Sequence, residues 1–109
     1  MANTAKRLAS AQLTATAATY YTSPAATKCI VTQIILTNVT GNNATASVSL
    51  VNSGGTPGAS NRIVEQVAVP AYGVVTLDLK QVLEASDFVS ALASAATAVN
   101  IRISGVEIV

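Results

Sequence analysis

The sequence predicts an all-β fold: a single β-sandwich or jelly roll of about seven to eight antiparallel strands with an extended N-terminal arm. Three observations support this prediction. Half of the 109 residues are hydrophobic, yet only 10% are charged and 4% aromatic. This mixture of Ala, Val, Ile and Leu with Thr and Ser suits pleated strands rather than solvated helices. Apolar and polar residues alternate over short runs, and turn-forming residues separate these runs at intervals of about 8–14 residues.

The N-terminal segment has the least regular pattern. We expect residues 1–18 to form an N-terminal arm or edge strand and residues 19–109 to form the β-sandwich domain. Between residues 7 and 16 only Leu8 and Leu13 are large and apolar. Tyr20 and Tyr21 end the arm, and Pro24 begins a corner.

A hairpin is predicted next, from two strands over residues 28–38 and 44–52. The intervening "VTGNN" holds the glycine and asparagines that tolerate turn dihedral angles. The second strand alternates regularly. In the first, strict alternation places one set of side chains on one face, namely Ile30, Thr32, Ile34 and Leu36. It places the other set on the opposite face, namely Cys29, Val31, Gln33 and Ile35.

The middle of the chain continues with a flexible loop at "SGGTPGASN" and a strand over residues 62–69. Ile63, Val67 and Val69 are predicted to face inward, with Glu65 as a polar member of that face. "PAYG" turns the chain into a strand over residues 74–80, and "QVLEASD" forms the turn that follows it.

The last two strands are predicted over residues 88–94 and 99–108. In the final strand Val99, Ile101 and Ile103 share one face. Gly105 then interrupts the alternation, and Val106 and Ile108 take over the opposite parity. A glycine at such a change of phase is typical of a β-bulge.

No combination of residues predicts a catalytic site or a cofactor. Cys29 is the only cysteine, and the chain has no histidine to serve as its base, so we interpret it as a packing residue. A metal site would have to rely on carboxylates, and Glu84 and Asp87 are too few for calcium. The glycine-rich loop lacks the Lys-Ser/Thr of a phosphate-binding loop. We predict a protein that is not an enzyme and has no metal, cofactor or small-molecule substrate.

The charge distribution limits the choice of partners. Six basic and five acidic residues give a net charge of +1, and the basic residues are scattered, which argues against nucleic-acid binding. No window has the roughly 18 apolar residues of a membrane span. The N-terminus does not show the apolar core of an export signal, so we expect synthesis in a cytoplasm. A surface so poor in charge favours a protein partner.

Four short segments resemble a group of small virion proteins of tailed bacteriophages. "YTSP" resembles their opening corner, and "IILTN" resembles their strand that ends in Asn before a turn. "EASDFVSALAS" is similar to their turn into the penultimate strand, and "RISGVEIV" to their C-terminal strand. The resemblance covers roughly residues 19 to 109. Ser86 stands where the family pattern often has Gly before the Asp.

The resemblance implies a capsid cement, or decoration, protein: a β-sandwich, homodimeric or homotrimeric, that bridges neighbouring subunits of the major capsid protein on the virion surface. Synthesis in the host cytoplasm follows from the same hypothesis. The interface is expected on the N-terminal arm, through Lys6, Arg7 and Leu8, and on the last strand, through Val106 and Ile108. The arm is expected to be dispensable for the fold, so that deletion of residues 2–16 leaves the sandwich intact.

Two other classes remain open at this point. One is a tail, neck or head fibre component, or a receptor- or sugar-binding module of a phage particle, which would use the loops at 53–61 and 70–73 with Tyr72. The scarcity of aromatic residues argues against sugar stacking. The other is a bacterial surface or pilus subunit, which would need an export signal.

Overall fold

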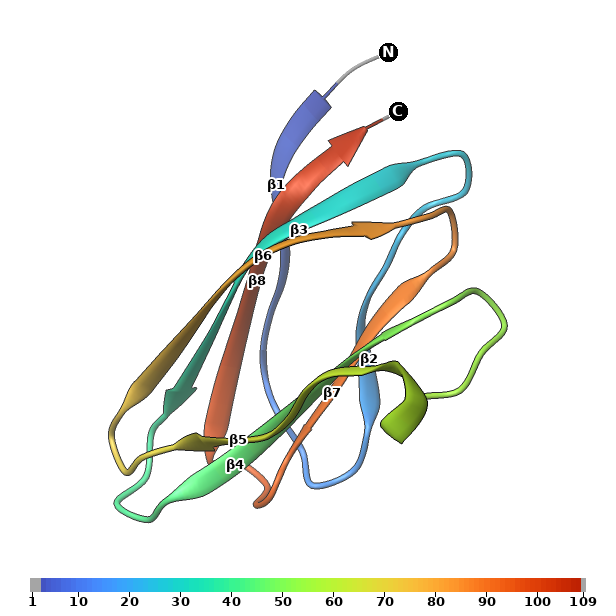
Figure 1. Cartoon of the computed structure of the whole chain (residues 1–109). Coiled ribbons are helices and arrows are strands. Elements are labelled where there is room, and N and C mark those ends of the chain that lie inside the picture. Colours follow the sequence, from blue (N-terminus) through green and yellow to red (C-terminus); the bar gives the residue numbers. More distant parts are fainter. Residues whose placement is uncertain (1–2, 109) are drawn as a thin grey trace.

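The protein folds into two four-stranded antiparallel sheets packed face to face (Figure 1). The structure is a computed structural model, and it describes residues 3–108. Apart from one turn of 3₁₀-helix, η1 (Ala59–Asn61), the regular structure in this range is strand. The strands are β1 (Asn3–Gln12), β2 (Ala18–Thr22), β3 (Lys28–Asn38), β4 (Ala44–Val51), β5 (Arg62–Val69), β6 (Val74–Leu83), β7 (Phe88–Ala93) and β8 (Val99–Ile108). The predicted all-β class is confirmed.

The strand order identifies the sandwich as a jelly roll. One sheet has the order β1-β8-β3-β6 and the other β2-β7-β4-β5. Four pairings are nested, β1 with β8, β2 with β7, β3 with β6 and β4 with β5. The chain is therefore one long antiparallel hairpin, rolled up so that β8 also pairs with β3 and β7 with β4. Eight strands in two such sheets form a jelly roll.

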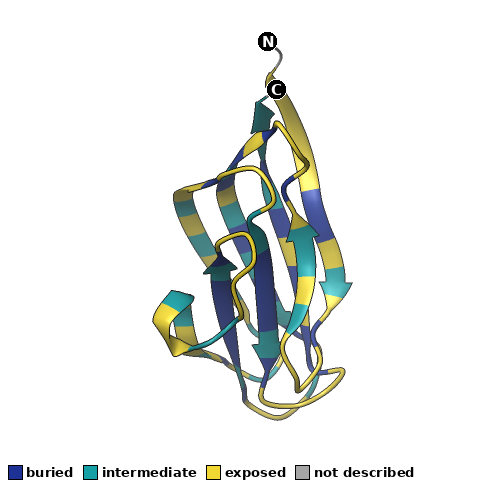
Figure 2. Ribbon diagram, turned by 90° about the vertical axis from the view of Figure 1, so that its right-hand side faces the viewer, coloured by how far each residue is buried: buried dark blue, intermediate teal, exposed yellow. Residues whose placement is uncertain are grey.

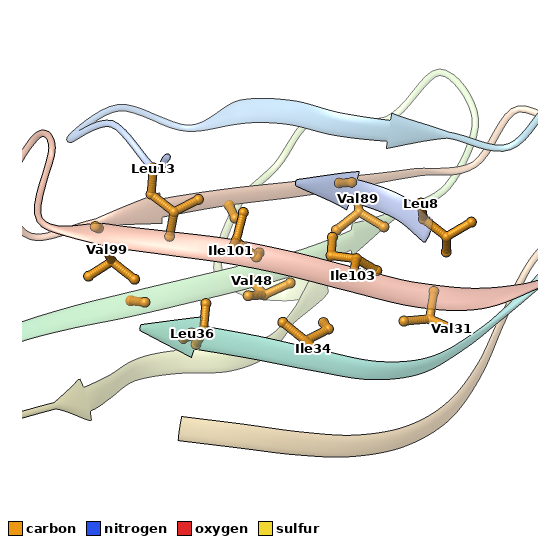
Figure 3. Close-up of a cluster of buried hydrophobic side chains, with 14 of the residues drawn as sticks. Leu8, Leu13, Val31, Ile34, Leu36, Val48, Val89, Val99, Ile101 and Ile103 are labelled. Carbon is orange, nitrogen blue, oxygen red and sulfur yellow. The ribbon is translucent and has the colours of Figure 1, made fainter. Parts of the chain in front are cut away.

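The core lies between the inner faces of the two sheets (Figure 3). It is built almost entirely from aliphatic side chains, because the chain has so few aromatic residues. Burying each Val, Leu or Ile stabilises the fold by about 1.5–3 kcal/mol relative to leaving it exposed. The largest fully buried side chains are Leu13, Ile34, Leu36, Leu83, Ile101, Ile103, Val31, Val48, Val51, Val69, Val89 and Val99.

The N-terminal segment is an edge strand of the first sheet rather than a free arm. β1 pairs with β8 along its whole length, and its side chains Leu8 and Leu13 are buried in the core. Deletion of residues 2–16 would remove both leucines, so the structure leads us to expect that this deletion destabilises the sandwich. The boundary at residue 18 stays a prediction.

The side chains of strand β8 alternate between the two faces of the sheet along its whole length. The bulges lie on the two neighbouring strands, β1 and β3. Ile103 and Ser104 are consecutive on β8, but their partners on β1, Ala9 and Arg7, are two residues apart. Leu8 is the extra residue. On β3, Thr32 is extra in the same way, between the partners of Ser104 and Gly105. The bulge predicted for Gly105 therefore lies on the adjacent strands, at the same level of the sheet.

The bulge at Thr32 changes which side chains of β3 face the core. Cys29 and Val31 point inward before it, and Ile34 and Leu36 point inward after it. The predicted division of this strand into two strictly alternating faces is therefore wrong at Thr32. Strand β8 itself has no change of phase, so Val106 and Ile108 lie on the face opposite to Val99, Ile101 and Ile103, which is the outer face of the sheet.

Strand β5 departs from prediction for the same reason. Val48 pairs with Val64, while Ala46 pairs with Val67, so β5 has one residue too many between these pairs. Val64 packs beside the core and Ile63 is exposed. The inward orientation predicted for Ile63 is wrong. Glu65, predicted on the inner face, instead forms an ion pair with Arg62 and accepts a hydrogen bond from Ser47.

Gly105 has no space for a side chain. A Cβ atom there would lie 2.3 Å from the Ile30 carbonyl oxygen and 2.8 Å from Leu8 Cδ1. The first of these contacts is with main chain, which cannot move aside without breaking the β3–β8 ladder. We expect Gly105→Ala to lower the free energy of unfolding by about 3 kcal/mol, measured by urea denaturation.

The matched control is Gly58→Ala. No atom lies within 4 Å of a Cβ atom at Gly58, whose φ of −176° is extended, so this variant should unfold within about 0.5 kcal/mol of the wild type. Equal stability of the Gly105 and Gly58 variants would contradict the close approach of β3 to β8.

Ser86 has a left-handed backbone, with φ of 69°. This explains why the related pattern often has Gly at the position: a residue with a Cβ atom costs about 1–2 kcal/mol in this conformation. We expect Ser86→Gly to raise the free energy of unfolding by up to about 1 kcal/mol. Gly removes the backbone strain of the folded state, but part of this gain is offset because Gly increases the conformational entropy of the unfolded chain. Thermal denaturation would show it as a higher Tm.

The reverse substitution serves as the control for Ser86. Gly54 has φ of 80° and nothing within 4 Å of a Cβ position, so Gly54→Ala introduces backbone strain without a clash. It should lower the free energy of unfolding by about 1 kcal/mol. If Ser86→Gly lowers the Tm, backbone strain does not dominate at that turn.

Candidate functional site

Cys29 is a packing residue, as predicted. Its side chain is fully buried in the core, and burial, above all, raises the pKa of its thiol. A protonated, buried thiol is neither a nucleophile nor a metal ligand. Across residues 3–108 no three His, Cys, Asp or Glu side chains form a group that could hold a metal ion. In the same range no helix is long and apolar enough to cross a membrane.

The five residues predicted at an interface do not form one surface. Lys6 and Arg7 are exposed on β1, and Val106 and Ile108 are half-buried on β8. Leu8 is only 8% exposed and belongs to the core, so its side chain is not available to a partner in the folded protein. Lys6 points inward to an ion pair with a β8 carboxylate. The other three share the outer face of the first sheet.

Strand register adds three residues to this outer face that were not among the five predicted interface residues. Val106 lies directly opposite Ala5 on β1 and Ile30 on β3, and Ile30 lies opposite Val82 on β6. These four residues form an apolar row across all strands of the first sheet. Val82, at the β6 edge, is 54% exposed.

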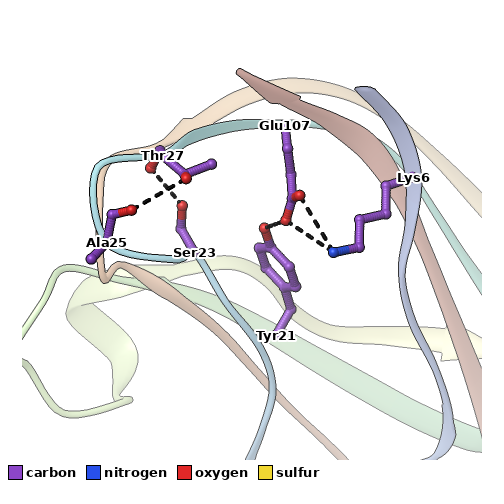
Figure 4. Close-up of polar contacts among 6 residues, drawn as sticks. All are labelled: Lys6, Tyr21, Ser23, Ala25, Thr27 and Glu107. Atoms are coloured by element: carbon purple, nitrogen blue, oxygen red, sulfur yellow. Dashed lines mark hydrogen bonds and ion pairs between the residues drawn. The ribbon is translucent and has the colours of Figure 1, made fainter. Parts of the chain in front are cut away.

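A polar cluster joins the two sheets at the end that carries the termini (Figure 4). The Tyr21 hydroxyl on β2 donates a 2.6 Å hydrogen bond to Oε2 of Glu107 on β8. Lys6 Nζ lies 3.4 Å from Glu107 Oε1, and the Glu107 side chain is 12% exposed. The hydrogen bond from Tyr21, more than the charge of Lys6, holds the pKa of Glu107 below its ordinary value. Burial, and then the same hydrogen bond, raises the pKa of Tyr21.

The first and third segments of the family resemblance meet at this end. Ser23, in "YTSP", donates its backbone N–H to the Asp87 carbonyl and accepts the Ser86 N–H at its own carbonyl. The Ser23 hydroxyl donates to the Thr27 carbonyl, 2.9 Å away, and closes the corner on itself (Figure 4). The two segments therefore brace each other, which is a structural role rather than a binding role.

The opposite end of the sandwich, which we call the loop end, has a different chemistry. It consists of the four loops 13–17, 39–43, 70–73 and 94–98, which connect the strands at the end away from the termini, together with Val74, the first residue of β6 (Figures 1 and 2). None of these loops contains a charged residue. Backbone hydrogen bonds join them to each other and to the adjacent strand ends.

Large apolar side chains are exposed at the loop end. Tyr72 is 77% exposed, Val74 59% and Val39 45%, and these are three of the five large hydrophobic residues exposed among residues 3–108. Sequence reasoning named Tyr72 only as part of an alternative and missed both valines. The available signal was the lack of charge in four separate loops, which becomes meaningful once the fold brings them together.

An open hollow of about 370 Å³ lies beside the loop end on the outer face of the first sheet. Arg102 supplies a guanidinium to it, Asn100 an amide, and Ser10 and Thr37 supply hydroxyls. None of these groups has the base, nucleophile or metal ligands needed for catalysis.

Known structures share this fold with the chain. A chain from the acid-stable capsid of Helicobacter pylori bacteriophage KHP30 matches with a TM-score of 0.54 at 14% identity, covering 100% of this chain and 89% of that one. A chain from the disulfide-linked pili of Bacillus endospore appendages matches with a TM-score of 0.56 at 18% identity, covering 96% and 86%. At such identities the likeness shows the fold alone.

A larger viral protein contains the same fold as a part. A chain of the infectious bursal disease virus particle matches with a TM-score of 0.61 at 10% identity, covering 96% of this chain but 30% of that one. This chain therefore spans less than a third of the length of that viral protein. No protein-family model matches the chain, and no curated protein sequence matches it.

The polar cluster makes stability depend on pH. We expect Tyr21→Phe to lower the free energy of unfolding by about 1–2 kcal/mol at pH 7, because it removes the shorter of the hydrogen bonds to the Glu107 carboxylate and leaves only that from Lys6. The pKa of Glu107 is lowered in the folded state, so its contribution is present above the unfolded pKa of about 4.3 and is lost as the pH falls through the folded value. Urea denaturation from pH 7 to pH 3 should show the two proteins converging.

Tyr20→Phe provides the control, since it removes the same group from the adjacent residue, which takes no part in the ion pair. Its effect should not change with acid. A difference between Tyr21→Phe and wild type that stays constant down to pH 3 would contradict the assigned role of Glu107.

Proposed function

We propose that the chain is a non-enzymatic structural protein of a bacteriophage virion, a capsid cement protein that binds the outer surface of the shell and bridges neighbouring major capsid subunits. The supporting observation is the match to the KHP30 capsid chain. It includes all of this chain and 89% of the other, so a chain of nearly this size, with little beyond one jelly roll, is a component of a capsid. The segments that resemble small phage virion proteins point to the same class.

The physical properties of the chain suit such a role. Cement must add favourable contacts without a triggering reaction, in many copies. Each contact can be modest, on the order of 1,000 Å² of buried surface, because the lattice presents many sites and an oligomer can engage several of them. A homodimer or homotrimer is part of this proposal. Because only 10% of the residues in the chain are charged, its surface can be desolvated at little electrostatic cost.

A tail, neck or head fibre component, or a sugar- or receptor-binding module, is the second candidate. The observation in its favour is Tyr72, which is 77% exposed in a loop, as expected for an aromatic that stacks on a ligand. The fold likeness to a pilus chain suggests a third assembly, a filament. The only cysteine of this chain is buried, so a disulfide between folded subunits is not available to it.

The number of copies per particle tests the proposal. In particles purified from the source, quantitative mass spectrometry against the major shell protein should give hundreds of copies in a simple ratio to the shell subunit. A lattice-wide protein must occupy every equivalent site, whereas a fibre or neck component is present in a few to about twenty copies. Absence from the particles would refute a virion role altogether.

Reconstitution adds a functional readout. Shells stripped of the protein should withstand heat less well than native shells, and the purified protein should restore the difference by mass action. An unrelated jelly-roll protein of similar size is the control. Binding without any gain in shell stability would favour decoration without cementing.

A further inference from the structure

The two ends of the sandwich differ in the kind of surface that they offer. The end with the termini carries the ion pairs Lys6–Glu107 and Lys28–Glu84. The loop end has no charged residue in any of its four loops, although it includes three of the five exposed large apolar side chains of residues 3–108. Charged residues are depleted and Tyr is enriched in the cores of protein interfaces.

Hydrogen bonds hold the loop end in one arrangement. Asn38 is buried, and its side-chain amide donates to the carbonyls of Asn42 at 2.7 Å and Val69 at 3.0 Å. Its side-chain oxygen accepts from the backbone and the hydroxyl of Thr40, both at 2.8 Å. Thr40 in turn accepts the Tyr72 N–H at 3.0 Å. A surface ordered before binding loses little entropy when a partner docks.

Tyr72 is held at this end in a strained conformation. Its φ is 54°, a left-handed value that is unfavourable for a bulky residue. The ring packs over Gly41, where an added Cβ atom would lie 3.4 Å from the hydroxyl oxygen. Tyr72 nevertheless stays 77% exposed. Contacts within the protein therefore cover only a small part of the aromatic ring, although its backbone is held in a strained conformation.

We propose that the loop end is the face by which the protein docks, and that its partner is an uncharged, apolar patch on a subunit of the shell, with Tyr72 as the anchor and Val39 and Val74 beside it. The inference rests on the proposed function and assigns the surface that performs it. Charged groups on a partner would lose their bound water on docking, and the four loops offer no opposite charge to compensate, so such a contact would be unfavourable. An uncharged partner incurs no such cost.

The size of the loop end argues against a second copy of this chain as the occupant. The molecule measures 45 × 26 × 18 Å, so a face across the long axis covers roughly 500 Å², well below the approximately 800 Å² per partner of a stable interface. A contact limited to this face would join two molecules in solution only weakly. A lattice supports contacts of this size, because an oligomer of the protein engages several shell subunits at once.

Val74→Lys and Val82→Lys form a matched pair for the test. Both valines lie on β6, on the same outer side and at similar exposure, 59% and 54%, but at opposite ends of the strand. Each lysine can extend into water, so both variants should unfold at the urea concentration of the wild type. Binding of each protein to stripped, purified shells is then measured as a dissociation constant, with Tyr72→Ala as a third variant.

We expect Val74→Lys and Tyr72→Ala to weaken binding at least about tenfold and Val82→Lys to change it less than about twofold. Weakening by Val82→Lys alone would overturn the inference, because it would place the interface on the apolar row at the other end, while leaving the proposed function intact. Conversion of an oligomer into a monomer by Val74→Lys would overturn it in favour of a second copy. Failure of the wild type to bind shells would refute the proposed function itself.

Discussion

The main chains of β3 and β8 approach each other closely at Gly105, and the half of the sandwich that carries the termini depends on this constraint. The Ile30 carbonyl occupies the space of a side chain at Gly105, and at this level both neighbours of β8 carry one extra residue, Leu8 and Thr32. Each bulge changes which side chains of its strand face the core, so the alternation of β1 and β3 near the termini is reversed relative to their alternation near the loop end. As a result Lys6 and Cys29 face inward, on the same side as Glu107, and the carboxylate meets Tyr21 of the other sheet.

The sequence was sufficient for the fold class and for most strands, because alternation and turn residues are local signals. It failed where one strand shifts against another. Thr32 and Ile63 were predicted on the wrong faces, because a bulge leaves no periodic mark of its own. Gly105 was interpreted as the bulge, although the bulges lie on its neighbouring strands. β2 was not predicted as a separate strand, because five residues with two tyrosines show no clear alternation.

The candidate site was predictable only in part, and for a related reason. The interface predicted on the N-terminal segment was a run of three adjacent residues, Lys6, Arg7 and Leu8. In the structure Leu8 is buried and Lys6 forms an ion pair with Glu107 of the same chain. The loop end is assembled from four loops that lie 20 or more residues apart in the chain. A single short loop without charged residues is not informative. The four loops become a recognisable surface only because the jelly-roll topology brings them together, with Val39, Tyr72 and Val74, on one face.

The nested pairing of the strands also determines when the fold can form during synthesis. The innermost pair, β4 with β5, can close as soon as its loop has been made, but β1 must wait for β8, the last strand. At about 5–20 residues per second the ribosome needs several seconds for that interval, and such non-local pairing is slow in any case. Until then β1 and its core leucines have no partner strand. The nascent chain therefore exposes an unpaired apolar segment until β8 has been made, and during that time the segment is open to aggregation or to binding by chaperones.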